Sequence, residues 1–214
     1  MKAWYFSTWD RRLRHGDGRE IRLGETHAVR GDIEMCSHGL HASKKLMDAI
    51  YYAPGTIVYR VELSGKVEEG VGKVVAQKRT YLSGGIDVSE TLRKFARMCA
   101  LDVVDMWEAP DIVIRYLTTG DKSIRDAAYG AALATARNDT WDAASTVARD
   151  AALAAALDAT SAAAWSSARA VARAAAPDAA CDAALDEARR KQNRRLTSMI
   201  ARAIRDAHFG GTND

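Results

Sequence analysis

Hydrophobic and polar residues follow two different patterns along the chain, and the change falls near residue 86. Before it, short runs of β-branched and aromatic residues lie between frequent glycines, which is typical of strands joined by turns. The predicted strands are residues 4–6, 56–63 and 74–82, and the second of them (TIVYRVEL) alternates most clearly. One helix is predicted between the first two strands: Ser43 is a suitable N-cap, and Pro54-Gly55 ends the helix.

Beyond Gly84-Gly85 the apolar residues recur at helical spacing. Asp87 or Ser89 is expected to cap a helix whose apolar face runs from Leu92 to Trp107. A second helix is expected to begin at Pro110 and to end at Gly120, and Asp121 is expected to cap a third.

Alanine dominates the later part of the chain, where it fills 29 of the 62 positions from 127 to 188. Its high helix propensity predicts about four further helices, packed antiparallel. The expected breaks are residues 138–140, 158–161 and 177–178. The predicted fold class is therefore α+β: residues 1–86 form a small mixed β-sheet domain with one or two helices, and residues 87–214 form an alanine-rich antiparallel helical bundle.

Alanine at every fourth residue, from Ala144 to Ala156, predicts smooth helix faces that approach one another closely. Each such contact buries little area, so we expect the bundle to gain stability from the first domain or from a second copy of the chain.

Composition indicates the cellular location and shows an uneven distribution of charge. The first residues contain no basic segment followed by an apolar one, and no long uncharged apolar run follows, so neither a signal peptide nor a membrane partner is expected. The three cysteines are odd in number and far apart, which favours a reducing compartment and a cytoplasmic location. The net charge is +3, but residues 126–188 hold 9 acidic and 4 basic groups, whereas residues 189–214 hold 7 basic and 2 acidic groups.

The densest group of reactive side chains is the segment CSHGLHAS at residues 36–43. Cys36, His38 and His41 are all metal-ligand types, but their spacing matches no common zinc pattern. A strand-to-helix turn with ordinary histidines is favoured, and no metal is expected. The chain also lacks the phosphate-binding loop, the G-x-S-x-G motif and the H-E-x-x-H motif.

The order of GLHAS at 39–43, VYRVELSG at 58–65 and KRTYL at 78–82 resembles small ADP-ribosyltransferase-like domains, and the rifampicin-modifying type most of all. The opening WYFST at 4–8 stands where that family has its first strand. The resemblance implies NAD as cofactor, with aromatic rings against the nicotinamide, His41 on the ribose and Glu62 polarising the nucleophile. The residues that it implies for catalysis are Tyr5, Ser7, His41, Tyr52 and Glu62. Ser7 departs from the pattern, because the family has a histidine there.

The whole arrangement is similar to small bacteriophage and prophage proteins that join a "G-F/L-H-A" domain to an alanine-rich helical tail. Residues 95–107 and the helices after them are also similar to proteins described as putative immunity proteins. These resemblances imply an accessory protein that acts by direct binding to a host protein or defence complex, as an anti-CRISPR-like inhibitor without catalysis. An NAD-dependent enzyme that modifies a host protein is the alternative.

Charge suggests where a partner would bind. The acidic middle of the chain could oppose a basic surface, and the basic last helix could contact nucleic-acid phosphates, an acidic protein or only solvent. The candidate partner-binding residues are Asp142, Asp150, Asp158, Arg190, Lys191, Arg194 and Arg195.

Overall fold

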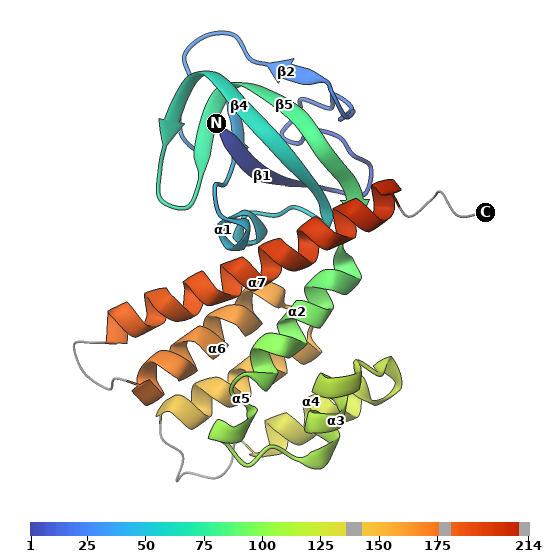
Figure 1. Ribbon diagram of the computed structural model, residues 1–214, viewed down its shortest axis with the longest axis vertical. Helices are drawn as coiled ribbons and strands as arrows, with labels where there is room; N and C mark the ends of the chain where they lie inside the picture. The colour runs from blue at the N-terminus through green and yellow to red at the C-terminus, as the bar shows by residue number, and fades with distance from the viewer. Residues whose placement is uncertain (136–142, 176–180, 210–214) are drawn as a thin grey trace. The chain divides into compact units, whose positions relative to one another are not determined.

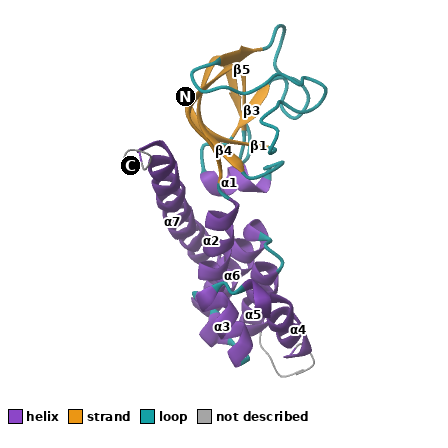
Figure 2. Cartoon of the chain, turned by 90° about the vertical axis from the view of Figure 1, so that its right-hand side faces the viewer, coloured by secondary structure: helices purple, strands orange, loops and turns teal. Residues whose placement is uncertain are grey.

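The computed structural model of the protein describes residues 1–135, 143–175 and 181–209. The fold class is α+β, as predicted, and every described strand lies in the first part of the chain (Figures 1 and 2). The chain divides into two compact units. Unit 1 comprises Met1–Ser89 together with Leu196–Asp214, and unit 2 comprises Glu90–Arg195. The first segment thus ends at Ser89, and the last residues of the chain are assigned to unit 1.

Unit 1 is built on an antiparallel sheet of five strands. The strands are β1 (Lys2–Ser7), β2 (Thr26–Ala28), β3 (Leu40–Ala42), β4 (Ile57–Glu69) and β5 (Val74–Asp87), and the short helix α1 is Leu46–Tyr51. Their order is β1-β4-β5-β2, and β3 also pairs with β5. The long hairpin of β4 and β5 therefore carries all the other strands (Figure 1).

Alternation along β4 explains the core of unit 1. Tyr59, Val61 and Leu63 are each at most 1% exposed and belong to one hydrophobic cluster. Leu13 and Ile21, from the segment between β1 and β2, pack into the same cluster. The alternation predicted from the sequence is thus the one that buries this face of the sheet.

The glycine pair Gly84-Gly85 does not end the strand, contrary to the prediction. The pairing of β5 with β4 continues to Asp87 through a register shift beside Tyr59. Both glycines have positive φ, and a side chain on Gly84 would collide with the carbonyl oxygen of Val58. The pair therefore forms a bulge inside a long strand, where only glycine fits the backbone.

Ser43 does not cap α1, which corrects the second local prediction. Its backbone exchanges two hydrogen bonds with Trp4, at 2.8 and 2.9 Å, so it extends the sheet instead. Lys45 occupies the N-cap position, and its side chain makes no capping bond. Backbone pairing with β1 outweighs the local capping preference of serine.

Unit 2 is helical. Its elements are α2 (Ser89–Leu101), η1 (Val104–Met106), α3 (Asp111–Thr119), η2 (Lys122–Ile124), α4 (Arg125–Ala134), α5 (Ala143–Ala156), α6 (Thr160–Ala175) and the first part of α7 (Cys181–Phe209). Gly120 ends α3 in the left-handed conformation, as predicted. Asp121 accepts a hydrogen bond from the Ser123 backbone at 2.9 Å and so caps η2, the 3₁₀ turn that leads into α4. The predicted breaks at 138–140 and 177–178 lie outside the described residues.

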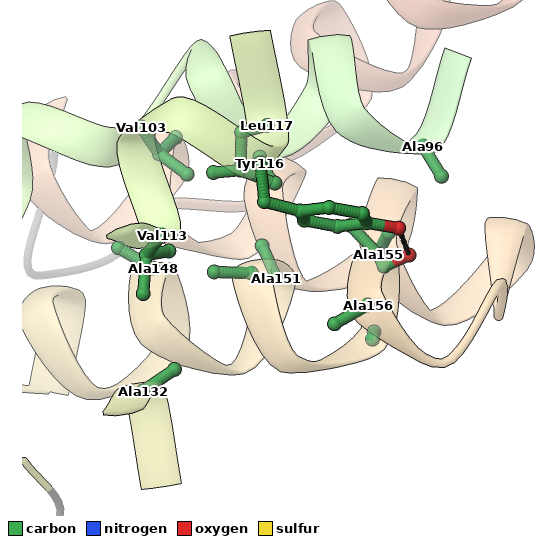
Figure 3. Close-up of a cluster of buried hydrophobic side chains, with 14 of the residues drawn as sticks. Ala96, Val103, Val113, Tyr116, Leu117, Ala132, Ala148, Ala151, Ala155 and Ala156 are labelled. Carbon is green, nitrogen blue, oxygen red and sulfur yellow. Dashed lines mark hydrogen bonds between the residues drawn. The ribbon is translucent and has the colours of Figure 1, made fainter. Parts of the chain in front are cut away.

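Small side chains shape the core of unit 2. Tyr116 of α3 lies across the α5 alanines Ala151 and Ala155, and its hydroxyl donates to the Ala155 carbonyl oxygen at 3.4 Å (Figure 3). Ala148 and Ala151 are completely buried in the same cluster. Methyl groups on α5 thus leave room for one large ring from the facing helix.

Within the described residues, no helix is long and apolar enough to cross a membrane.

We expect Ala151→Leu to destabilise unit 2 by about 1–3 kcal/mol, because the added atoms have no free space in a packed alanine face. Ala162→Leu on α6 is the matched control, since Ala162 is exposed and leucine is also a good helix former. Urea unfolding followed by circular dichroism measures both. Equal midpoints for the two variants would contradict close packing at Ala151.

Candidate functional site

A group of aromatic rings surrounds a buried arginine in unit 1. Tyr59 and Tyr81 are at most 1% exposed, and their ring centroids lie 5.4 Å apart. Tyr5 of β1 completes the group, with its ring centroid 6.3 Å from each of the other two. The cross-strand pairing of Tyr5 with Tyr59 brings these rings to one face of the sheet.

Arg79 lies at the centre of this group and is only 2% exposed. Its Nε and Nη2 donate to the Tyr81 hydroxyl at 3.1 and 2.8 Å, and its Nη1 donates to the His41 carbonyl oxygen at 2.5 Å. Its guanidinium lies 3.7 Å from the centroid of the Tyr5 ring. Among the described residues no carboxylate pairs with Arg79 within 4.0 Å, so hydroxyl, carbonyl and ring faces replace a counter-ion.

The hydrogen bonds at Tyr81 determine the protonation state and the tautomer of the His27 ring. Burial raises the pKa of Tyr81 to about 12, so the phenol keeps its proton. Arg79 can only donate, so that proton is free to go to His27 Nδ1, which lies 3.1 Å from the phenol oxygen. Burial also lowers the pKa of His27, which favours the neutral ring that this bond requires. Its other nitrogen, Nε2, then carries hydrogen and lies 3.5 Å from Glu25.

The five residues implied for NAD chemistry do not converge. Tyr5 and His41 both contact Arg79, through its guanidinium face and through a carbonyl oxygen respectively. Ser7 is completely buried, and its hydroxyl donates to the neighbouring Thr8 carbonyl oxygen at 3.1 Å. Tyr52 is the C-cap of α1, and its ring lies against Lys73 rather than Arg79.

Glu62 is exposed between the buried residues Val61 and Leu63. Alternation along β4 therefore places it on the opposite face of the sheet from Tyr59 and its partner Tyr5. A carboxylate there does not face the aromatic group.

A second group of reactive side chains lies at the edge of the sheet, and the sequence analysis identified only part of it. The backbone N–H of Cys36 donates to His41 Nε2 at 3.1 Å, and Lys73 Nζ donates to Cys36 Sγ at 2.6 Å. The Lys73 ammonium also lies 4.9 Å from the centroid of the Tyr52 ring. This group combines a thiol, an amine and an imidazole. The thiol is in reach of solvent, because Cys36 is exposed.

Electrostatics fix the protonation of this group. Burial lowers the pKa of His41, and the nearby cations Lys73 and Arg79 lower it further. The ring is therefore neutral near pH 7, and its Nε2 is free to accept from Cys36. The hydrogen bond to Cys36 raises the pKa of Lys73, which remains an ammonium.

The metal-ligand types in residues 36–41 are committed to other partners. His38 Nε2 lies 2.9 Å from the Arg30 carbonyl oxygen, and Cys36 and His41 are held as described above. Across the part of the chain that the structure describes, no group of three or more metal-ligand side chains comes together.

Two exposed tyrosines beside this group, together with an exposed valine on the adjacent turn, make up what we call the tyrosine surface. Tyr51 is 72% exposed, Tyr52 is 46% exposed, and their rings are perpendicular with centroids 4.9 Å apart. Val71, at the turn between β4 and β5, is 95% exposed. The turn is close to α1, because a Cβ on Gly72 would lie 3.7 Å from the Tyr52 ring.

The charged residues predicted to bind a partner are largely paired within unit 2. Asp158 accepts from Arg93 and Arg125 at 3.1 and 3.5 Å, and Asp150 pairs with the adjacent Arg149 at 3.3 Å. Asp142 lies outside the described residues.

Most of the predicted basic residues of α7 also form ion pairs. Arg190 and Arg194 both pair with Glu187, at 3.0 and 3.3 Å. Arg195 forms a two-bond pair with Asp102 at 2.6 and 3.1 Å. Lys191 is exposed.

Comparison with known proteins adds one match. Residues 9–94 match a family that is described as a domain of unknown function, DUF7666. The matched stretch covers most of unit 1, including Arg79, Tyr59, Tyr81 and the tyrosine surface, but it begins after Tyr5. No curated protein and no solved structure matches the chain.

We expect unit 1 to lose stability as the pH falls below about 6.5. The pKa values of His27 and His41 are lowered in the folded state, so the unfolded chain takes up protons first. His41→Gln keeps an acceptor for the Cys36 N–H and removes one titrating group, so its stability should depend less on pH. Urea midpoints between pH 7.5 and 5 measure this. His208→Gln, at an exposed site, is the control, and an equal slope in His41→Gln would contradict the assignment.

Proposed function

We propose that the protein acts by binding another protein, without catalysis, and that the tyrosine surface makes the contact. The observation that carries the proposal is the high exposure of Tyr51, Tyr52 and Val71 on one edge of unit 1. Tyrosine supplies a large apolar area together with a polar hydroxyl, and it is enriched among the residues that dominate binding energies.

The tyrosine surface is well supported by its neighbours. Lys44, just before α1, pairs with Glu69 at the end of β4 at 2.5 Å. Lys73 lies against the Tyr52 ring from the start of β5. These contacts hold α1 and the hairpin turn together, so binding would cost little ordering entropy. The charged residues beside the rings resemble the polar rim of a protein interface.

We propose a host defence complex as the partner, in the host cytoplasm. This part of the proposal rests on the similarity of residues 39–43 and of the alanine-rich tail to phage and prophage accessory proteins. Such complexes handle nucleic acid and carry basic surfaces, and the net negative charge of residues 126–188 would favour encounter with them at long range. Asp150 and Asp158 are already paired within unit 2, so we expect them to contribute little to direct contact with the partner.

Nucleic-acid binding through α7 receives less support. Three of its arginines, Arg190, Arg194 and Arg195, are already engaged by carboxylates of unit 2. Each would have to leave its partner to reach a phosphate.

The NAD-dependent alternative also receives less support from the geometry. It requires Glu62 and the ribose-binding His41 in one cleft with an aromatic platform. Glu62 lies on the other face of the sheet, and the Tyr5 ring is already covered by the Arg79 guanidinium.

Replacement of both Tyr51 and Tyr52 by serine is expected to abolish activity against a defence system. The assay expresses the chain in bacteria that carry an RNA-guided nuclease and measures the plaquing of a targeted phage. Loss of one central tyrosine typically costs about 2 kcal/mol, which is roughly 30-fold in affinity. Trp9→Ser is the matched control, because Trp9 is 85% exposed in the same unit. Protection by the double variant equal to that of the wild type would refute the role of this surface.

Calorimetry with NAD separates the two functions directly. We expect no saturable heat at millimolar NAD with the purified chain. Saturable binding that is weakened by Glu62→Ala and by His41→Ala would overturn the binding proposal in favour of the enzyme.

A further inference from the structure

The Cys36 thiol and the Lys73 amine form a pair that the proposed function does not use. Lys73 Nζ lies 2.6 Å from Cys36 Sγ, although 37 residues separate them along the chain. Cys36 is exposed, so small solutes can reach the sulfur. An amine in contact with a solvent-accessible thiol is an arrangement in which an oxidised sulfur has a nucleophile at hand.

Both atoms are held from several sides. Cys36 sits in a turn whose ends, Glu34 and His38, exchange backbone hydrogen bonds at 2.7 and 3.0 Å. Its backbone has a φ of +70°, and its N–H is fixed by His41 Nε2 at 3.1 Å. Lys73 is bounded on another side by the Tyr52 ring. The short contact therefore arises from a defined arrangement rather than from two freely moving surface groups.

The other cysteines provide a contrast within the same chain. Cys99 is completely buried, and burial raises its pKa to about 12, so its thiol is unreactive. Cys181 is half-buried near the start of α7. Within the described residues, Cys36 is the cysteine that combines exposure with a lysine amine in contact with its sulfur.

We propose that Cys36 and Lys73 form a reversible covalent bond when the protein meets a peroxide. In the first step, hydrogen peroxide transfers one oxygen to the thiol, which becomes a sulfenic acid, and water leaves. In the second step, the Lys73 nitrogen attacks the sulfur, the S–O bond breaks, and a second water leaves. The product is a sulfur–nitrogen bond, a sulfenamide.

The electrons and protons balance with peroxide as the only oxidant. A thiol, an ammonium and one hydrogen peroxide give the sulfenamide, two waters and one proton. The sulfur is oxidised and the peroxide is reduced. The lysine gives up one proton before it attacks and another as the bond forms, and the leaving oxygen takes one of these. A small thiol reverses the reaction by attacking the sulfur, so that the amine leaves and takes up a proton.

Proximity favours capture by Lys73 over further oxidation. The amine is in contact with the sulfur before the reaction, so its effective concentration far exceeds that of a second peroxide. The bond also protects the sulfur from irreversible oxidation to the sulfinic acid.

Peptide mapping of the full chain tests the proposal. After treatment with hydrogen peroxide and digestion by trypsin without reductant, the peptides of Cys36 and Lys73 should appear joined, with the loss of two hydrogen atoms and no cleavage after Lys73. Dithiothreitol should separate them. A diketone probe that labels sulfenic acids should label Cys36 strongly in Lys73→Arg and weakly in the wild type, because arginine keeps the charge but does not capture the sulfur.

Cys181→Ser is the matched control and should form the joined peptide as the wild type does. Lys73→Gln, compared by circular dichroism with the wild type, repeats the probe test if Lys73→Arg does not fold. The proposal fails if no joined peptide forms. It also fails if Cys36 is labelled equally with and without Lys73, or if Cys36 is oxidised no faster than Cys181.

Discussion

The pairing of β4 with β5 is the constraint on which the rest of unit 1 depends. β1 hydrogen-bonds to β4, and β2 and β3 both hydrogen-bond to β5, so no strand of unit 1 is placed independently of this hairpin. The register of β5 pairs His27 with Arg79 and His41 with Val75. Both histidines thus reach their hydrogen-bond partners because of strand pairing. The bulge at Gly84-Gly85 lets the hairpin bend while the pairing continues to Asp87.

Arg79 links three strands through its side chain, because its hydrogen bonds and ring contacts require partners from each of them. A buried guanidinium is costly unless its donors are satisfied, and here Tyr81, the His41 carbonyl oxygen and the face of Tyr5 satisfy them. These partners come from β5, β3 and β1, so a shift in the register of β1 or β3 would remove one partner of the buried charge. The same contact places the Arg79 guanidinium over one face of the Tyr5 ring, so that face is closed to a nicotinamide.

Local signals in the sequence predicted the elements, and contacts between distant residues determined the sites. Alternation in TIVYRVEL, Pro54-Gly55 and Gly120 each identified a strand, a turn or a helix end, because their preferences are local. Gly84-Gly85 misled because a glycine pair fits a bulge as well as a strand end. Cys36 and His41 were recognised as neighbours, whereas Lys73 could be joined to them only once the register of β3 on β5 was known. The sequence shows that acidic and basic residues are unevenly distributed along the chain. It does not show that Asp158, Arg190 and Arg195 form ion pairs within unit 2.

The thiol–amine pair and the tyrosine surface meet at one residue, Lys73, which contacts both Cys36 and Tyr52. Capture of the amine by the sulfur would remove the positive charge that lies against the Tyr52 ring, because a sulfenamide nitrogen is not protonated. A cation over a partly exposed ring contributes about 0.5–1 kcal/mol. Oxidation would therefore alter the tyrosine surface only modestly. Loss of Tyr52 would leave the Cys36 backbone held by His41 but would remove one contact of Lys73. The proposed binding surface and the proposed redox pair are thus adjacent in unit 1 and share Lys73.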